Sequence, residues 1–408
     1  MEHLKNLQLP INKQAIEVCR ILQNSGHQSY IVGGCVRDIL LKTNPKDWDI
    51  TTSATPQQVM ALFPKNYPTG LQHGTVTVSM GDGLENQFEV TTFRVEGKYI
   101  DGRRPEEVFF VTDIKEDLAR RDLTINAMAY DPINNIMIDP FNGQNDLNNK
   151  IIKAVGNAND RFKEDGLRIM RVARFAARFG YSVHEETLNG MKSNLDTLKK
   201  VSVERIQDEL SKTLMTSNPK LGLKLLKESG VLEIICPYLF SLTEHSYSKY
   251  NGELETRIST LYSSYKDIAE VKYELSELKF SNQEIKKTIF LLDLLLKYVE
   301  FSKIDNVLSY KEFMAHIKNN SPYNWEAMLE QFIILSSNVS LSSKETLSKY
   351  NDVVVFSRKE MQINGNDLMD IGIKPGPEIK RMLDKCYLEI LFYPENNNKE
   401  ILIKKIGI

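Results

Sequence analysis

The first part of the chain alternates short runs rich in β-branched residues with amphipathic segments. Alternating apolar and polar positions predict strands at residues 30–32, 48–51, 75–79 and 88–93. Apolar positions spaced three and four residues apart predict helices at residues 15–23, 36–41 and 56–63. Strands that alternate with helices in this way indicate an α/β layer.

The remainder of the chain has a different pattern. From residue 157 onward the strand signals nearly vanish, and helical patterns such as EDGLRIMRVARFAARFG and RIQDELSKTLM follow one another. Turn residues interrupt the periodicity at residues 217–219, Gly230, Pro237, 319–322 and 375–377. We therefore expect a long all-α region behind the α/β layer.

Composition indicates an ordinary globular protein. The 408 residues are 41% hydrophobic and 26% charged, and this length suits roughly two to four domains with buried cores. The formal net charge of −2 gives no general attraction to nucleic acid, so any contact with RNA has to come from local basic patches.

The four cysteines are scattered and show no metal-binding spacing, so we expect reduced, buried thiols. They are Cys19, Cys35, Cys236 and Cys386. The N-terminal sequence MEHLKNLQLPINKQ lacks the apolar core of a signal peptide, and the richest apolar run, IFLLDLLL, is too short and too charged to span a bilayer. These features predict a cytoplasmic protein with no membrane partner.

The segment GGCVRDILLKTNPKDWDITT, residues 33–52, carries the first candidate chemistry. If DWDIT is a strand, Asp47 and Asp49 project from the same face, and two adjacent carboxylates suit Mg²⁺. Gly33 and Gly34 let backbone N–H groups approach a triphosphate closely, at what is predicted to be the start of a helix. A lone Asp-x-Asp is usually a turn or a solvated pair, but its combination with the glycine pair predicts a phosphate and metal site.

A further carboxylate and a charged loop follow. Glu89 lies on the predicted strand QFEVTTF and is a candidate to accept the proton of an attacking hydroxyl, although a salt-bridged edge residue is equally compatible. Residues 94–107 have neither helical nor strand periodicity. This predicts a loop, and charged loops of this length are either solvated or active-site lids.

The segment DLARRDLTINAMAYD, residues 117–131, adds two arginines. Asp122 is predicted to be the N-cap of a helix at residues 123–129. Arg120 and Arg121 precede it and are able to reach a phosphate, although pairs of surface arginines are mostly solvated.

The predicted helix at residues 164–179 carries Asp165, Arg168, Arg171 and Arg174 at every third position. On one helix these residues form an inclined ridge about 13 Å long, a length that suits a nucleotide. The alternative is a solvated basic stripe with intrahelical ion pairs to Asp165.

The order of donors and acceptors on this ridge favours particular bases. Cytosine and adenine both offer an exocyclic amine beside an unprotonated ring nitrogen, so Asp165 can accept from the amine while Arg168 donates to the nitrogen. Guanine and uracil present the reverse order, so one Asp–Arg pair would accept CTP and ATP and reject GTP and UTP. Arg171 and Arg174 would then be left for phosphates or stacking.

The combined motifs resemble a known family. GGCVRDILL with DWD resembles the nucleotidyltransferase superfamily that includes DNA polymerase β. Continued by FEVTTFR, RRDLTINAMAYD, DPFNGQNDL, EDGLRIMRVARFAARFG and RIQDEL, the chain resembles the bacterial class II tRNA nucleotidyltransferases, the CCA-adding enzymes. The resemblance is strong over residues 32–214, and it returns at GNDLMDIGIKPGPEIKRML, residues 365–383. The family's usual glycine after the first helix is Lys42 here, and a frequent alanine is Cys35.

The resemblance implies roles for individual residues. Positions that match the family's nucleotide-binding motifs are Gly34, Arg37, Arg121, Asp165, Arg168, Arg171 and Arg174, and we add Gly33 to them. Asp47 and Asp49 match the family's Mg²⁺ positions. The implied reaction is attack of a tRNA 3′-hydroxyl on the α-phosphate of CTP or ATP, with release of pyrophosphate.

Other activities of the same lineage are alternatives. An A-adding enzyme and a poly(A) polymerase are both compatible with the motifs, whereas the full RVEGKYIDGRRPEEV sequence disfavours a CC-adding enzyme, which typically lacks that loop. A catalytically silent RNA-binding protein is disfavoured by the intact pair Asp47 and Asp49.

The resemblance also implies a domain order. We expect a polymerase-β-like head at residues 1–155, then an elongated series of helical domains: a neck at 156–217, a body at 218–320 and a tRNA-binding tail at 321–408. Lys374, Lys380 and Arg381 make the tail locally basic, which fits a grip on tRNA or an ordinary charged surface.

Overall fold

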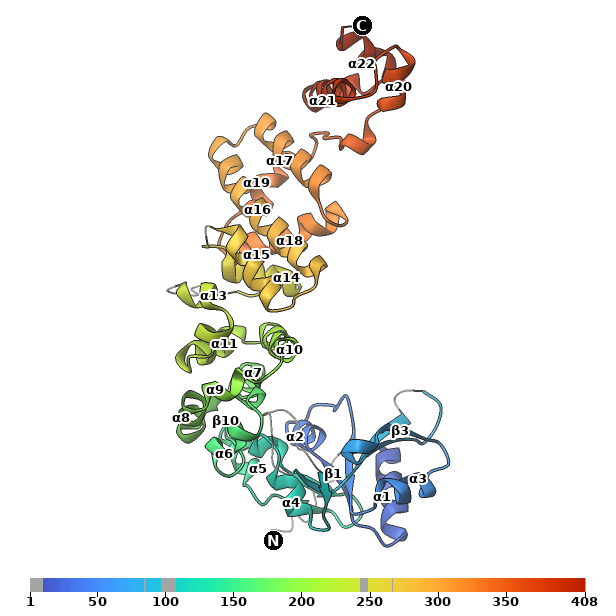
Figure 1. The fold of residues 1–408 in the computed structure, drawn as a ribbon, viewed down its shortest axis with the longest axis vertical. Coiled ribbons are helices and arrows are strands. Elements are labelled where there is room, and N and C mark those ends of the chain that lie inside the picture. Colours follow the sequence, from blue (N-terminus) through green and yellow to red (C-terminus); the bar gives the residue numbers. More distant parts are fainter. Residues whose placement is uncertain (1–9, 84–85, 97–107, 243–248, 266, 408) are drawn as a thin grey trace. The chain divides into compact units, whose positions relative to one another are not determined.

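A seven-stranded mixed sheet organises the N-terminal part of the protein (Figure 1). The computed structural model describes residues 10–83, 86–96, 108–242, 249–265 and 267–407, and the chain divides into two units, Met1–Ile235 and Cys236–Ile408. The strand order is β3-β4-β5-β2-β1-β8-β9, with β2 and β5 parallel and the other neighbours antiparallel. The bounds of these strands are β1 (Ser29–Val32), β2 (Asp49–Thr52), β3 (Asn66–Gly70), β4 (Thr75–Ser79), β5 (Gln87–Thr92), β8 (Ala129–Asp131) and β9 (Ile136–Ile138).

One face of the sheet is apolar, and helices cover it. Val76, Val78 and Val90 alternate with polar residues along β4 and β5 and are fully buried, and α1 and α3 pack on these strands and their neighbours. A capping box between Thr55 and Gln58 fixes the start of α3. The helices and 3₁₀ turns of this region are α1 (Lys13–Asn24), α2 (Gly34–Leu40), α3 (Pro56–Leu62), η1 (Leu71–His73), α4 (Ile114–Ala119), η3 (Thr124–Asn126) and α5 (Gly143–Asn148).

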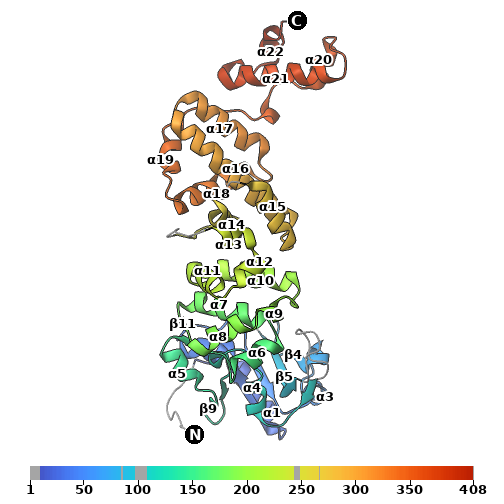
Figure 2. The same ribbon diagram turned by 60° about the vertical axis from the view of Figure 1, so that its left-hand side comes forward.

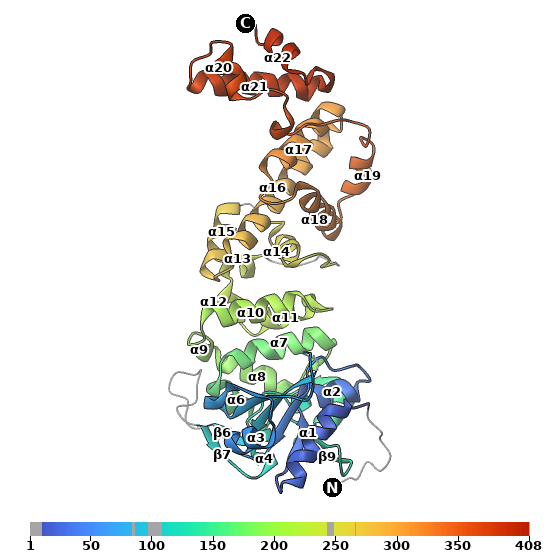
Figure 3. The same ribbon diagram turned by 90° about the vertical axis from the view of Figure 1, so that its right-hand side faces the viewer.

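Helices complete the N-terminal unit. Figure 3 shows α7 beneath α10 and α11, and α7 packs against both of them. The bounds are α6 (Ala158–Glu164), α7 (Leu167–Phe179), α8 (Glu185–Ser193), α9 (Leu195–Leu198), α10 (Val203–Leu214), α11 (Pro219–Glu228) and α12 (Val231–Ile235). Four short strands form two small ladders, β6 (Arg94–Glu96) with β7 (Val108–Phe110) and β10 (Ile151–Ile152) with β11 (Ser182–Val183).

The second unit is helical throughout its described residues (Figure 2). A capping box between Ser281 and Glu284 starts its longest helix, whose apolar side contributes Leu291, Leu294 and Tyr298 to a continuous core. Its elements are α13 (Pro237–Ser241), α14 (Leu254–Tyr262), α15 (Ile268–Glu277), α16 (Asn282–Ile304), α17 (Val307–Asn320), α18 (Trp325–Asn338), α19 (Ser343–Ser348), η4 (Arg358–Glu360), α20 (Gly365–Asp370), α21 (Pro377–Phe392), η5 (Pro394–Asn396) and α22 (Lys399–Lys405).

The predicted division into an α/β layer and a helical remainder is confirmed. The predicted helices at residues 15–23, 36–41 and 56–63 correspond to α1, α2 and α3, and the predicted strands correspond to β1, β2, β4 and β5. None of the helices in the described part of the chain combines the length and apolar character that a bilayer crossing demands.

Three predicted elements are wrong in detail. The strand at residues 48–51 begins only at Asp49, because β1 leaves the ladder at Val32 to turn into α2 and offers no partner for earlier residues. The expected helix at residues 123–129 is a 3₁₀ turn followed by β8, which pairs with β1. Part of the expected loop at residues 94–107 forms β6, while residues 97–107 lie outside the described residues.

A fourth correction concerns the helix expected at residues 164–179. It is two helices, α6 ending at Glu164 and α7 beginning at Leu167, with Asp165 in an extended conformation between them. Gly166 follows with a helical backbone, and the backbone of Thr197 lies so close that a Cβ on Gly166 would be 2.5 Å from it.

Candidate active site

Three carboxylates gather where β2 and β5 run side by side. Asp49 is the first residue of β2 and is paired in register with Glu89 on β5, so both side chains project from the same face. Asp47 lies in the bend just before β2, outside the strand. Burial raises the pKa of Asp49, and the nearby charges of Glu89 and Asp47 raise it further, while Arg121 opposes them. The site therefore concentrates negative charge and favours a bound cation.

The glycine turn lies at the end of β1. Gly33 has φ +80° and ψ −130°, a conformation that side chains other than glycine rarely adopt. Its N–H donates to the carbonyl oxygen of Met128 at 3.1 Å. A Cβ on Gly33 would lie 2.8 Å from Nη1 of Arg121, so the arginine rests directly against the glycine backbone. Gly34 follows as the first residue of α2.

Arg121 is held in place by a buried acid. Asp117 is fully buried, and it pairs with Arg120 at 2.8 Å and with Arg121 at 3.4 Å. Burial would raise the pKa of Asp117, but the two arginines outweigh it and the pKa is lowered. The Nε of Arg121 is buried and has no hydrogen-bond partner among the described residues. A cation with an unused donor beside a glycine turn is suited to an anionic ligand.

Arg37 lies inside the protein. The residue is 3% exposed, and its side chain donates to Asp38 Oδ1 at 2.7 and 2.9 Å and to Asn126 Oδ1. Its guanidinium carbon lies 5.4 and 5.0 Å from the ring centroids of Phe175 and Phe179 on α7. Arg37 thus ties α2 to α7.

A polar relay of Arg37, Asn126, Asp122 and Arg171 extends this connection. The Nδ2 of Asn126 donates to Asp122 Oδ1 at 3.3 Å, and Nε of Arg171 donates to Asp122 Oδ2 at 2.7 Å. Burial opposes the charge on Asp122, but Arg171 and Asn126 outweigh it and lower the pKa of the carboxyl to about 2. Asp122 is therefore not a helix N-cap but the centre of a relay between the glycine turn and α7.

Asp165 and Arg168 are near each other in sequence but have different partners. Asp165 accepts from Nη2 of Arg205 at 2.8 Å and from the N–H of Leu167 at 3.0 Å. Arg168 is 8% exposed and pairs with Glu164 at 2.5 Å, and it also donates to the carbonyl oxygen of Arg120 at 3.0 Å. The expected ridge therefore consists of the three arginines of α7, without Asp165.

Two site residues on α10 were not predicted. Arg205 holds Asp165, and Glu209, which is 3% exposed, accepts from Nε of Arg174 at 2.6 Å. Both lie in RIQDEL on α10, four residues apart, a spacing that places them on one helix face. This four-residue spacing was the signal that the sequence offered for both residues. It places an acid and a base on one face of a helix, where they are able to pair with charged residues of a neighbouring helix such as α7.

Cys35 follows the two glycines of the turn, but we expect its thiol to be unreactive. Its thiol donates to the carbonyl oxygen of Val32 at 3.2 Å, and burial raises its pKa to about 12. All four cysteines are free and buried, which confirms the prediction for them.

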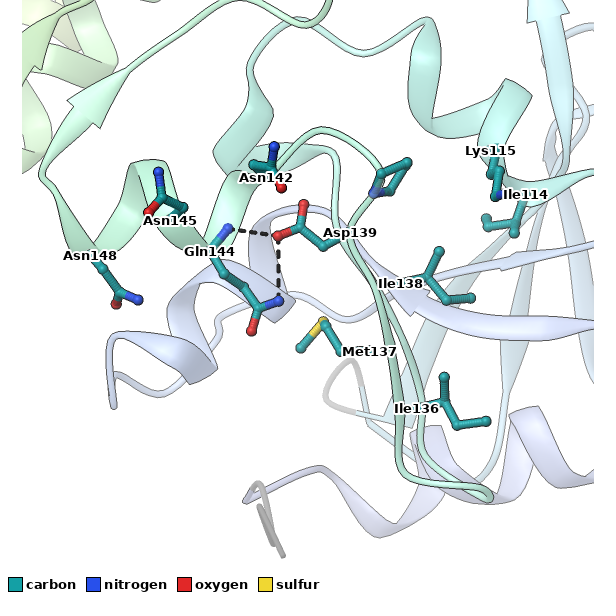
Figure 4. A pocket seen from close by; sticks show the side chains of 11 residues that line it. Ile114, Lys115, Ile136, Met137, Ile138, Asp139, Asn142, Gln144, Asn145 and Asn148 are labelled. Carbon is teal, nitrogen blue, oxygen red and sulfur yellow. Dashed lines mark hydrogen bonds between the residues drawn. The ribbon is translucent and has the colours of Figure 1, made fainter. Parts of the chain in front are cut away.

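A cavity elsewhere in the N-terminal unit is not part of this site. It has a volume of about 660 Å³ and is lined by β9 and by the amide side chains of α5 (Figure 4). Asp139 at its wall accepts from the backbone and side-chain amides of Gln144. None of the predicted site residues lines this cavity.

Comparisons with known proteins cover nearly the whole chain. The Poly A polymerase head domain family matches residues 29–153, the family described as RNA and SrmB-binding site of polymerase A matches residues 180–242, and tRNA nucleotidyltransferase domain 2 matches residues 254–406. The CCA-adding enzyme of Ligilactobacillus salivarius (strain UCC118) is 38% identical over 403 residues, 96% of this chain and 95% of the relative. That of Bacillus cereus (strain 03BB102) is 36% identical, covering 97% of this chain and 98% of the relative.

The fold is likewise similar to a solved structure. The CCA-adding enzyme of Bacillus stearothermophilus in complex with CTP superposes with a TM-score of 0.70 and 29% sequence identity, covering 97% of this chain and 98% of that one.

Proposed function

Because this chain belongs to the CCA-adding enzyme family of tRNA nucleotidyltransferases, we propose that it extends the 3′ end of tRNA with CMP and AMP from CTP and ATP. Pyrophosphate is the second product. The observation that carries this proposal is the set of Asp47, Asp49 and Glu89 beside the Gly33 turn and Arg121. That set stands in a chain that matches CCA-adding enzymes almost from end to end.

A divalent metal ion belongs to this family's chemistry, and the residues present fit one. The donors are carboxylate oxygens, which suit hard cations, and the raised pKa of Asp49 reflects crowded negative charge that a cation relieves. No group of three or more His, Cys, Asp and Glu side chains in the described part of the chain is arranged to enclose a metal ion. Mg²⁺ keeps several waters and shares its shell with substrate phosphates, so one or two protein carboxylates suffice to hold it.

We assign Asp47 and Asp49 to hold Mg²⁺, and Glu89 to accept the proton of the attacking hydroxyl. Bound Mg²⁺ would neutralise charge on the reacting phosphates. The position of Glu89 supports this role. Glu89 is exposed on β5 directly beside Asp49, so a substrate hydroxyl can reach its carboxylate.

The triphosphate is assigned to Gly33, Gly34 and Arg121. Gly33 offers backbone without a side chain, and Arg121 offers a donor without a protein acceptor. The guanidinium of Arg37 already donates hydrogen bonds to Asp38 and Asn126. We therefore assign Arg37 to orient the turn rather than to contact the phosphates.

Base choice is assigned to Asp165 and Arg168, and Arg171 and Arg174 are assigned to the rest of the nucleotide. Asp165 keeps unused acceptor positions for an exocyclic amine, because a carboxylate has about four and, within the described part of the chain, Arg205 and Leu167 donate to it. Arg168 is fixed by Glu164 and is thus a rigid donor.

The domain order of head, neck, body and tail, with boundaries after residues 155, 217 and 320, remains a proposal. A cytoplasmic location is proposed as well, supported by four free cysteines, the state that a reducing compartment maintains.

The decisive experiment offers tRNA ending before, within or after CC, with CTP and ATP separately and together. Addition of CMP, CMP and AMP in that order supports the proposal. Addition of AMP alone to a tRNA ending in CC identifies an A-adding enzyme. A long tail grown on a generic RNA with ATP identifies a poly(A) polymerase, and no Mg²⁺-dependent transfer identifies a silent RNA-binding protein.

A further inference from the structure

A row of side chains crosses four strands of the sheet at the level of Asp49. Asp49 on β2 pairs with Glu89 on β5, Glu89 pairs with Thr77 on β4, and Thr77 pairs with Tyr67 on β3. Residues opposite one another on adjacent strands project to the same face, so all four share the face of the carboxylates. Three strand spacings place Tyr67 about 14 Å from Asp49.

The outer end of this row is open to solvent. Tyr67 is 50% exposed although it lies in a sheet, and Glu89 is exposed as well. The hydroxyls of Thr69 and Thr77 bond to each other at 2.8 Å beside the ring. A register shift follows between Tyr67 and Gly70, and such bulges at sheet edges re-aim a side chain. The tyrosine ring therefore presents an apolar, solvent-facing surface in line with the carboxylates.

The nucleotide-binding groups lie on the opposite side of Asp49. Gly33 ends β1, which is the neighbour of β2 away from β5, and Arg121 rests on Gly33. In phosphoryl transfer the attacking and leaving oxygens lie roughly in line on opposite sides of phosphorus. If the triphosphate occupies the β1 side, the attacking hydroxyl arrives from the β5 side, past Glu89.

We propose that Glu89, Thr77 and Tyr67 form an acceptor row, along which the 3′-terminal nucleotides of the RNA lie, with a base stacked on Tyr67. This inference rests on the proposed function. Unpaired RNA ends are commonly held by stacking on aromatic rings, which accept every base because each has a π-face. Such tolerance suits an acceptor whose last base changes with each addition.

The test compares Tyr67→Thr with Tyr67→Phe. Threonine keeps a residue that favours an edge strand but removes the ring, and phenylalanine keeps the ring and is the matched control. CMP incorporation is measured on a tRNA that lacks CCA, with separate KM values for tRNA and for CTP, and with the melting temperature of each variant.

We expect Tyr67→Thr to raise the KM for tRNA about five- to hundredfold, with the KM for CTP and the melting temperature unchanged and Tyr67→Phe within about twofold of the parent. An unchanged KM for tRNA in Tyr67→Thr overturns the acceptor row, as does an equal rise in both KM values or a loss in Tyr67→Phe as large as in Tyr67→Thr. Failure of the proposed function is distinct, because the unsubstituted protein would then incorporate neither CMP nor AMP.

Discussion

Substituting alanine for Gly33 is expected to damage the site far more than the same substitution at Gly34. Gly33 has φ +80°, and holding a residue with a side chain in such a conformation costs about 1–3 kcal/mol. The added Cβ would also lie 2.8 Å from Nη1 of Arg121, so the arginine has to move. Gly34 has an ordinary helical backbone, and its Cβ would lie 3.4 Å from Nη2 of Arg37, a normal contact distance.

These numbers set the expected sizes of the two effects. A cost of about 1–3 kcal/mol corresponds to a factor of about 5 to 150. We therefore expect kcat/KM for CTP in Gly33→Ala to decrease by at least a factor in that range, and we expect its melting temperature to be lower. Gly34→Ala should be neutral or slightly stabilising, because alanine is preferred over glycine in helices by up to about 1 kcal/mol.

The assay is incorporation of labelled CMP into tRNA that lacks CCA, combined with thermal unfolding of both variants. A loss of activity in Gly34→Ala as large as that in Gly33→Ala, with unchanged stability, would contradict the expected difference between the two glycines. If Gly33→Ala matches the parent in activity and stability, the strained turn and its contact with Arg121 do not matter for the reaction, and our description of the site is refuted.

Three further substitutions test other parts of the site. Asp49→Asn should abolish nucleotide incorporation. The metal-free variant should be as stable as the parent or more stable, because burial and neighbouring acids already disfavour the negative charge of Asp49. Retained turnover would contradict the metal assignment. Asp122→Asn should cost about 2 kcal/mol at pH 7. The pKa of Asp122 is lowered to about 2 from its ordinary value of 3.8, so this stabilisation is complete above about pH 4 and lost as the pH falls through about 2. Urea unfolding at pH 7 and pH 3 measures it, and a pH-independent difference would argue against the ion pair with Arg171. Asp165→Ala should raise misincorporation of GMP and UMP relative to CMP and AMP, and unchanged selectivity in competition assays would count against the base-edge argument.

Local pattern was enough to predict the elements that carry the candidate site residues. The glycine pair, the two aspartates and the position of Glu89 on a strand are all encoded within short segments, and each of those segments forms the expected element near the expected residues. Their meeting on one sheet face follows from strand pairing between β2 and β5. The roles assigned to these residues remain predictions.

Tertiary contacts decided what local pattern missed. The periodicity of residues 164–179 is helical throughout, yet the chain is extended at Asp165, whose carboxylate accepts from Arg205, a residue distant in sequence. Residues 123–129 have helical character, yet pairing with β1 draws their end into a strand. The partners Asn126 and Arg205 were missed for the same reason, because amide and guanidinium groups acquire these contacts only when remote elements pack together.

The burial of Cys35 has a practical consequence for handling the protein. Alkylating reagents and peroxide attack the thiolate rather than the thiol, and a pKa of about 12 leaves almost none of it at neutral pH. Although this sulfur lies in the first turn of α2, next to the glycines that we assign to the triphosphate, iodoacetamide or mild oxidation should spare the folded enzyme. Inactivation by such reagents would then indicate that the protein has unfolded. Modification of Cys35 can therefore be used to test whether the protein is still folded during purification and storage.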